Sequence, residues 1–172
     1  MFEIESWSKS EVHSVSRELL FSFNHMWFLM EQWIRRNCPE KVDSDDFQKL
    51  SEEFGAYEAQ RLDKTIDKKI TGLDRVMQFL KYSHWSAFED IELTKLSDKS
   101  LRMRTIGCTA QKAVKKRGMD YYDCGRGGLM LRKGFFGHID STAQVVRIFT
   151  PPDKKPSEIP EGVSCEWIIS IK

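Results

Sequence analysis

Apolar residues recur with a helical period over the first part of the chain. Between Ser10 and about Asn37 they fall on two adjacent stripes, Val12, Val15, Leu19, Met26, Leu29 and Trp33, and Leu20, Phe23, Trp27, Met30 and Ile34. Two neighbouring stripes make an apolar face too wide for a helix that packs on one side only. We therefore expect a long first helix, capped by Ser10 and covered on two sides, either by the rest of the domain or by a second copy of the chain. The second alternative predicts a homodimer.

Two further helices are expected before residue 90. Ser44 is the expected cap of an apolar stripe that continues to about Asp67, and Thr71 with Asp74 resembles a capping box before a shorter stripe that ends near Tyr82. Both stripes have the three- and four-residue spacing of a helix with one buried face.

The pattern changes to alternation after Asp90. Residues 91–106 alternate around the turn Ser97–Ser100, and residues 144–171 alternate around a Pro-rich loop, so each segment predicts an antiparallel β-hairpin. Between the hairpins we expect a short basic helix, Thr109–Arg117, and a further helix, Gly127–Ile139. Helices combined with antiparallel hairpins predict an α+β fold, and the length of 172 residues fits a single domain, 1–172.

The composition is that of a globular chain, with 40% hydrophobic and 31% charged residues. A formal net charge of +1 argues against a general nucleic-acid binder, which usually carries a basic excess. No apolar run is long enough to span a membrane. The four cysteines are widely separated, which favours free thiols, and we expect a cytoplasmic protein without nucleic-acid or membrane partners.

Cys124 is the first candidate catalytic residue. It lies in the glycine-rich segment Asp123–Gly128, just before an expected helix and beside Arg126. A helix N-terminus and a nearby cation both favour the thiolate, which is the nucleophilic form. The glycines also allow backbone N–H groups and Arg126 to receive an anionic ligand group. The alternative is that the glycines only permit a tight turn around a small core cysteine.

Two carboxylates lie on or near apolar stripes. Glu58 falls between Phe54 and Leu62, where burial would suit a general acid or base; the alternative is an ordinary pair with Arg61 on one helix face. The same ambiguity applies to Glu31, a candidate ligand-binding residue. The other candidates for a pocket wall are aromatic or lie at a helix end: Trp27, Trp85, Phe88 and His138.

The segments that carry a family resemblance are distributed along nearly the whole chain. They are Trp27-Phe28 with Glu31, Glu58-Ala59-x-Arg61, Trp85-x-x-Phe88-Glu89-Asp90, Leu96–Lys99, Cys108-Thr-x-Gln111, Lys116–Gly118, Pro151–Asp153 and Cys165–Trp167. As an ordered set they resemble a family of uncharacterised cytosolic proteins grouped near L-2-amino-thiazoline-4-carboxylic acid hydrolase. More distantly, the chain is similar to 4-vinyl reductase-type small-molecule-binding domains. The resemblance implies helices and a small antiparallel sheet that enclose a ligand cavity, commonly in a dimer.

Some 4-vinyl reductase-type domains hold zinc with cysteines near the C-terminus. In this chain Thr150 and Arg147 stand where relatives often carry additional thiols. A structural zinc takes four protein ligands, and Cys108, Cys124 and Cys165 are the thiols that could converge on one.

Three functions therefore stay open. The first is a small-molecule-binding or sensory domain with a pocket between helices and a small antiparallel sheet, without a cofactor. The second is a hydrolase of a small heterocyclic or amide-like substrate, with Cys124 or Glu58 as the catalytic group. The third is a zinc-stabilised interaction protein.

Overall fold

The computed structural model describes residues 7–42 and 44–172 of the chain. The chain divides into two compact units, Met1–Phe47 and Gln48–Lys172. The expectation of one domain over residues 1–172 stays a prediction. No helix of the described ranges is both long and apolar enough to cross a lipid bilayer.

The first unit is dominated by the long helix α1, Lys9–Asn37, which confirms the helix expected there. Its N-cap is Ser8 and not Ser10: the Ser8 hydroxyl accepts the backbone N–H of Glu11, whose carboxylate accepts the Ser8 N–H. This reciprocal pair is a capping box, which satisfies donors that the first helical turn leaves free. A short helix, α2, Pro39–Val42, follows and was not expected from the pattern.

Large apolar side chains remain exposed along α1. Phe23 is 65% exposed and Trp33 is 57% exposed. The others that are exposed extend over the whole helix: Val12, Val15, Leu19, Leu20, Phe21, Met26, Trp27, Leu29 and Met30. All members of the two stripes predicted from the sequence are therefore exposed except Ile34, which is half-buried.

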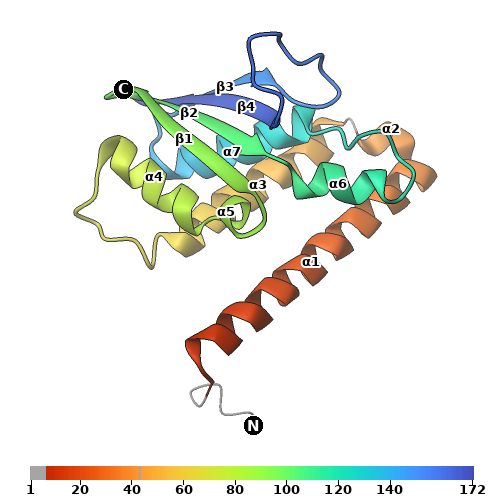
Figure 1. Cartoon of the computed structure of the whole chain (residues 1–172), viewed down its shortest axis with the longest axis horizontal. Coiled ribbons are helices and arrows are strands. Elements are labelled where there is room, and N and C mark those ends of the chain that lie inside the picture. The colour runs from red at the N-terminus through yellow and green to blue at the C-terminus, as the bar shows by residue number, and fades with distance from the viewer. Residues whose placement is uncertain (1–6, 43) are drawn as a thin grey trace. The chain divides into compact units, whose positions relative to one another are not determined.

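The second unit combines helices with one sheet (Figure 1). Its helices are α3, Asp45–Leu62, which begins at the end of the first unit, and then α4, Gly72–Tyr82, α5, His84–Phe88, α6, Thr109–Lys115, and α7, Gly125–Ile139. α3 is shorter than expected, and α5 was not expected. The Thr71 side chain makes no capping hydrogen bond to α4, so the capping interaction inferred there is wrong.

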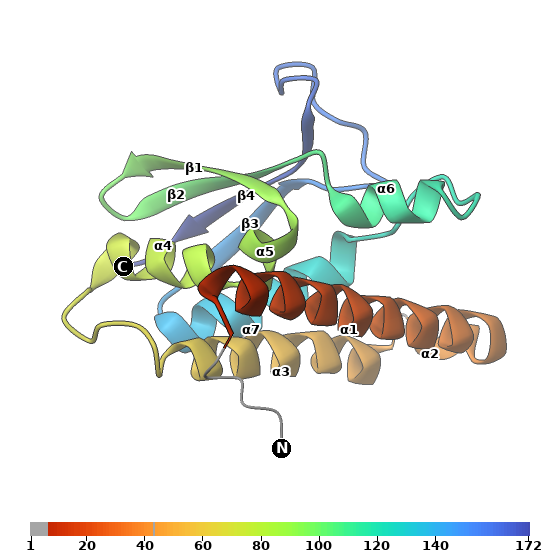
Figure 2. The same ribbon diagram turned by 60° about the horizontal axis from the view of Figure 1, so that its bottom comes forward.

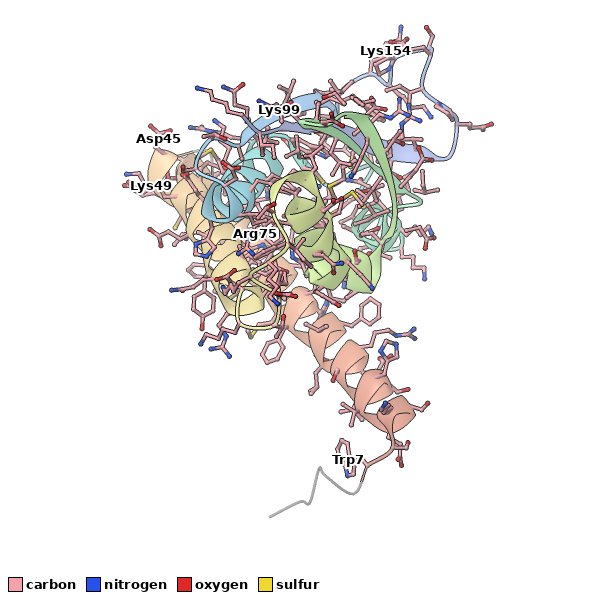
Figure 3. All side chains as sticks on the ribbon, turned by 90° about the vertical axis from the view of Figure 1, so that its left-hand side faces the viewer. Trp7, Asp45, Lys49, Arg75, Lys99 and Lys154 are labelled. Atoms are coloured by element: carbon pink, nitrogen blue, oxygen red, sulfur yellow. The ribbon has the colours of Figure 1, made fainter. Side chains whose placement is uncertain are left out.

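The four strands are β1, Asp90–Ser97, β2, Ser100–Ile106, β3, Gln144–Phe149, and β4, Val163–Ser170. They form one antiparallel sheet in the order β1-β2-β4-β3. Both predicted hairpins are present, and the pairing of β2 with β4 joins them: Met103 lies opposite Trp167, and Thr105 lies opposite Cys165. The α+β fold is thereby confirmed. Figure 3 marks Lys99 in the tight β1–β2 turn and Lys154 in the long β3–β4 loop.

The helices of this unit lie on one side of the sheet, with α7 between the sheet and α3 (Figure 2). Two glycines allow α3 and α7 to approach closely. A Cβ atom at Gly55 would meet the carbonyl oxygen of Leu131, and one at Gly134 would meet the carbonyl oxygen of Glu52, both well inside van der Waals contact. Each helix thus contributes a glycine where the backbone of the other helix passes.

The core of this unit contains a cluster of aromatic rings among aliphatic side chains. Phe135 of α7 makes edge contacts with Phe79 of α4 and Trp85 of α5, with ring centres 6.2 and 5.1 Å apart. Edge-to-face pairs of this kind add to the free energy gained by burying the rings. Trp167 of β4 is fully buried in the same cluster. Two rings of this cluster, Trp85 and Trp167, contact the side chain of Arg132 on α7.

Candidate functional site

The guanidinium group of Arg132 lies inside the second unit. Arg132 on α7 is only 5% exposed, and its guanidinium carbon lies 4.8 Å from the ring centre of Trp85 and 4.1 Å from that of Trp167. Its Nη1 donates to the carbonyl oxygen of Gly128 at 3.1 Å, whereas its buried Nε has no hydrogen-bond partner. Within the described residues, no carboxylate forms an ion pair with Arg132. A buried cation is thus held by two indoles and one carbonyl.

Cys124, Gly128 and Arg132 follow one another at four-residue spacing, so they share one face of α7. A Cβ atom at Gly128 would lie 3.4 Å from Nη1 of Arg132 and 3.7 Å from the Trp167 ring. The glycine therefore leaves room for the guanidinium and the indole. Cys124 is the N-cap residue of the same helix, and its Sγ accepts a hydrogen bond from Nε2 of Gln111 at 3.4 Å.

The other two candidate thiols border the same group. Cys165 on β4 accepts a hydrogen bond from the indole N–H of Trp167, with 3.4 Å between Nε1 and Sγ. Cys108, at the N-cap of α6, has its Sγ 3.7 Å from a carboxylate oxygen of Glu89. Glu89 also accepts the backbone N–H and the hydroxyl of Thr109, at 2.8 and 2.7 Å. Cys108, Cys124 and Cys165 all lie close enough to Arg132 to interact with its charge.

Burial dominates the protonation of these groups. It raises the pKa of the Cys108 thiol to about 11, with a further contribution from the negative charge of Glu89. Burial raises the pKa of the Cys124 thiol to about 12, the other two thiols add to the increase, and Arg132 opposes it. Burial also lowers the pKa of Arg132, against the attraction of the thiols and Glu89. At neutral pH both thiols are therefore protonated.

The expectation that Cys124 is a thiolate with a lowered pKa is wrong. The residue is at a helix N-terminus, as predicted, but the loss of hydration outweighs the helix end and the cation. The cation that acts on Cys124 is Arg132 and not Arg126, which is exposed.

The three thiols do not form a metal site in this arrangement. In the part of the chain that the structure describes, no group of three or more His, Cys, Asp or Glu residues could hold a metal ion. A zinc ion prefers four closely placed N, S or O ligands, and the nearby Arg132 adds a repelling positive charge. Zinc therefore finds no support among the described side chains.

Glu58 of α3 binds His84, the first residue of α5. Its Oε2 lies 2.6 Å from Nδ1 of the His84 ring, and its Oε1 accepts the backbone N–H of His84 at 2.7 Å. The alternative pair of Glu58 with Arg61 is not formed. The His84 ring lies against that of the adjacent Trp85, with 4.4 Å between their centres. The Glu58–His84 pair thus adjoins one of the two indoles that cover Arg132.

The other predicted site residues have separate environments. In the first unit, Glu31 is buried and accepts two hydrogen bonds from Arg35, and Trp27 is 40% exposed and stacks on Phe47. In the second unit, Phe88 is half-buried and His138 is exposed. The structure brings Trp85 into the Arg132 cluster and leaves His138 and Arg126 outside it.

A groove of about 650 Å³ lies elsewhere in the second unit, along α4 and β1. None of the predicted site residues lines it; its walls are formed by Lys69, Ile70, Thr71, Asp74, Met77, Gln78, Lys81 and Leu93.

Sequence reasoning overlooked Arg132 and His84. The signal for Arg132 was available, because this basic residue shares a face of the expected helix with the apolar residues Phe135 and Phe136. No signal existed for His84, since its contact with Glu58 joins residues 26 positions apart in the chain.

Comparison with known proteins gives a family without an assigned activity. A search of curated proteins found no match. The model of the family of unknown function DUF6125 matches residues 15–171, which is nearly the whole chain. The chain therefore belongs to the family of unknown function DUF6125.

Proposed function

We propose that this protein is a small-molecule-binding or sensory domain whose ligand presents an anionic group to Arg132. The observation that carries the proposal is a guanidinium group, buried between indoles, that forms no ion pair with a carboxylate of the described residues and has an unused Nε–H donor. A buried charge without a partner costs folding free energy. A bound anion would offset that cost through charge-assisted hydrogen bonds.

The surroundings of Arg132 favour binding over chemistry by a thiol. The pKa values of about 11 for Cys108 and about 12 for Cys124 leave very little thiolate at neutral pH. Protonated thiols are soft, weakly polar groups that line a site without attacking its ligand. The resemblance to thiazoline-carboxylate hydrolase keeps a hydrolase as the alternative, but the nucleophile in that alternative is not Cys124.

We propose in addition that the chain forms a homodimer through α1. The support is the row of large apolar side chains exposed along that helix, since contiguous apolar surface of this kind marks protein contacts. A cytoplasmic location is proposed from the four free cysteines, Cys38, Cys108, Cys124 and Cys165.

The binding proposal is tested by differential scanning fluorimetry with glutarate as the anionic probe and glutaramide as its neutral counterpart. A ligand that binds only the folded state raises the melting temperature in proportion to the logarithm of its concentration. We expect glutarate, and not glutaramide, to stabilise the wild-type protein. Native mass spectrometry of the purified protein provides a second readout, a small acidic compound that is released on denaturation.

The matched variants are Arg132→Met and Arg126→Met. Both remove one positive charge from α7, but only the first removes the buried guanidinium. The proposal requires that Arg132→Met abolish the glutarate effect and that Arg126→Met retain it. Equal stabilisation of the two variants by glutarate would overturn it, as would a wild-type protein that neither responds to the probe nor carries a compound.

A further inference from the structure

His84 and Glu58 form a hydrogen-bonded pair that the proposed binding site does not use. The Glu58 side chain is 14% exposed and that of His84 is 25% exposed. Both oxygens of Glu58 bind His84, one at Nδ1 and one at the backbone N–H. No residue of the described chain forms a hydrogen bond with Nε2 of His84.

This contact determines which ring nitrogen carries the proton. An ionised carboxylate only accepts hydrogen bonds, so Nδ1 of His84 is the donor to Glu58. In the neutral ring the lone pair is then on Nε2, which is the tautomer that a general base requires. A carboxylate that orients an imidazole through Nδ1 is a recurring arrangement in enzymes that use histidine as a base.

The pair and the proposed anion site both contact Trp85. The His84 ring centre is 4.4 Å from that of Trp85, and the guanidinium carbon of Arg132 is 4.8 Å from the ring of the same tryptophan. The imidazole and the guanidinium are therefore at most about 10 Å apart. A small molecule with an acid group at one end and a reactive carbonyl at the other has dimensions of this order.

We infer that His84 is a general base for the hydrolysis of an ester or amide bond in a small anionic substrate, and that Glu58 positions it. Nε2 removes a proton from a water molecule, and the water oxygen forms a bond to the carbonyl carbon. The bond from that carbon to the alcohol or amine then breaks, and the proton on Nε2 passes to the leaving group. One water molecule is consumed, and no oxidant, reductant or metal enters the balance.

The inference uses the proposed function only for the anchor of the substrate, because the acid group binds Arg132. It adds a reaction, a base and a positioning residue that the binding proposal does not contain. In this inference the His84–Glu58 pair, and not Cys124, acts on the substrate. This agrees with the raised pKa values of the Cys108 and Cys124 thiols, which are protonated at neutral pH.

The experiment measures the release of nitrophenolate from the mono-nitrophenyl ester of glutaric acid, with nitrophenyl acetate as the uncharged comparison. The variants are His84→Asn and the control His138→Asn, which changes an exposed histidine of the same unit. A positioned general base contributes about 10²–10⁴-fold to a rate. We expect His84→Asn to lower kcat by about 100-fold or more and His138→Asn to leave it unchanged.

Glu58→Gln separates positioning from folding. A residue that only orients the base changes kcat more than KM, so we expect kcat to fall about tenfold with KM nearly constant, and Glu58→Asp to recover part of the loss. Arg132→Met should raise KM for the charged ester more than it raises KM for the neutral ester. Circular dichroism and the melting temperature show whether each variant is folded. If His84→Asn is unfolded, His84→Gln takes its place in the experiment.

Hydrolysis no faster than in buffer would overturn the inference, and so would equal kcat values for His84→Asn and His138→Asn. The glutarate thermal shift distinguishes this failure from that of the binding proposal. If the wild-type protein binds glutarate but does not cleave the ester, Arg132 is an anion site and His84 is not a general base. If the protein cleaves both esters at equal rates through His84, then His84 is a base but Arg132 does not anchor the substrate. The second result overturns the inferred substrate class.

Discussion

The indole of Trp167 links the buried cation to a thiol. Its ring centre lies 4.1 Å from the guanidinium carbon of Arg132, and its N–H donates to Sγ of Cys165 at 3.4 Å. The negative face of the indole thus stabilises the cation, while the positive N–H edge is satisfied by sulfur. Trp167 is fully buried on β4 opposite Met103, so the sheet determines the position of the indole and hence of the guanidinium.

Arg132→Met should leave the protein as stable as the wild type or stabilise it by about 1 kcal/mol. The substitution removes a charge whose burial lowers its pKa, and apolar replacements of buried charges are often neutral or stabilising. The loss of the contacts with Trp85 and Trp167 opposes this gain. Urea denaturation measures the difference.

The comparison for that measurement is Arg132→Ala, which removes the charge and also the volume. It should destabilise the protein by about 2 kcal/mol or more, because the cavity between the indoles is not filled. If Arg132→Met were instead the less stable of the two, the guanidinium would be a structural element of the core and not a group kept for a ligand.

The fold was largely predictable because its elements are local patterns. The helical stripes and the two alternating segments identified α1, α3, α4, α7 and both hairpins within a few residues. The pairing of β2 with β4 was not predictable, since it joins Thr105 to Cys165 across the intervening helices and loop. The short helices α2 and α5 carry too few residues for a period to show.

The candidate site was predicted only in part. Cys108, Cys124 and Cys165 were identified as thiols that could meet, and they do border one group, Arg132. Their protonation could not be predicted, because a sequence shows a helix end and a nearby cation but not the loss of hydration. The partner of Glu58 also depends on the tertiary structure. The nearest cation in the sequence is Arg61, but Glu58 binds His84.

Gly55→Ala and Gly134→Ala should each destabilise the protein by more than about 2 kcal/mol. In both cases the added methyl group meets the backbone of the facing helix, at the carbonyl of Leu131 or Glu52, so α3 and α7 must separate. Thermal unfolding followed by circular dichroism checks the change.

Gly137→Ala is the matched control on α7. Nothing lies within 4 Å of the position that its Cβ would occupy, so only the helix preference for alanine acts. This substitution should therefore stabilise the protein by about 0.5–1 kcal/mol. A loss at Gly137 as large as that at Gly134 would show that the close approach of the helices is not the cause.

The free energy of unfolding should fall as the pH rises above about 9. The pKa of Cys108 is raised to about 11 and that of Cys124 to about 12, from an ordinary value of 9.0. The folded state therefore holds these protons more tightly than the unfolded state. The stabilisation is complete below pH 9 and is lost as the pH rises toward the folded values, at about 1.4 kcal/mol per pH unit for each thiol.

Cys124→Ser removes one of the two titrating thiols and should reduce this slope by about half between pH 9 and 11. Labelling with iodoacetamide gives a second measurement, because the thiolate is the reactive form. Cys108 and Cys124 should react at neutral pH about 100-fold or more slowly than an ordinary exposed thiol, and all four cysteines should react quickly in urea. Rapid labelling of Cys124 in the folded protein would contradict the protonated state.

The proposed dimer predicts that a charge on the apolar surface of α1 produces a monomer. Phe23 is the most exposed of the large apolar residues on this helix, at 65%, so Phe23→Glu changes the surface without opening a cavity in the core. Asn24→Glu introduces the same charge at the adjacent position, about 100° around the helix axis. Sedimentation equilibrium at micromolar concentration should show a dimer for the wild type and for Asn24→Glu, and a monomer for Phe23→Glu. A monomeric wild-type protein would contradict the dimer, and a dimeric Phe23→Glu would place its interface on another surface.

The melting temperature gives a second measurement. If Phe23→Glu is a monomer, its melting temperature should depend less on protein concentration than that of the wild type, because only the dimer is stabilised by mass action.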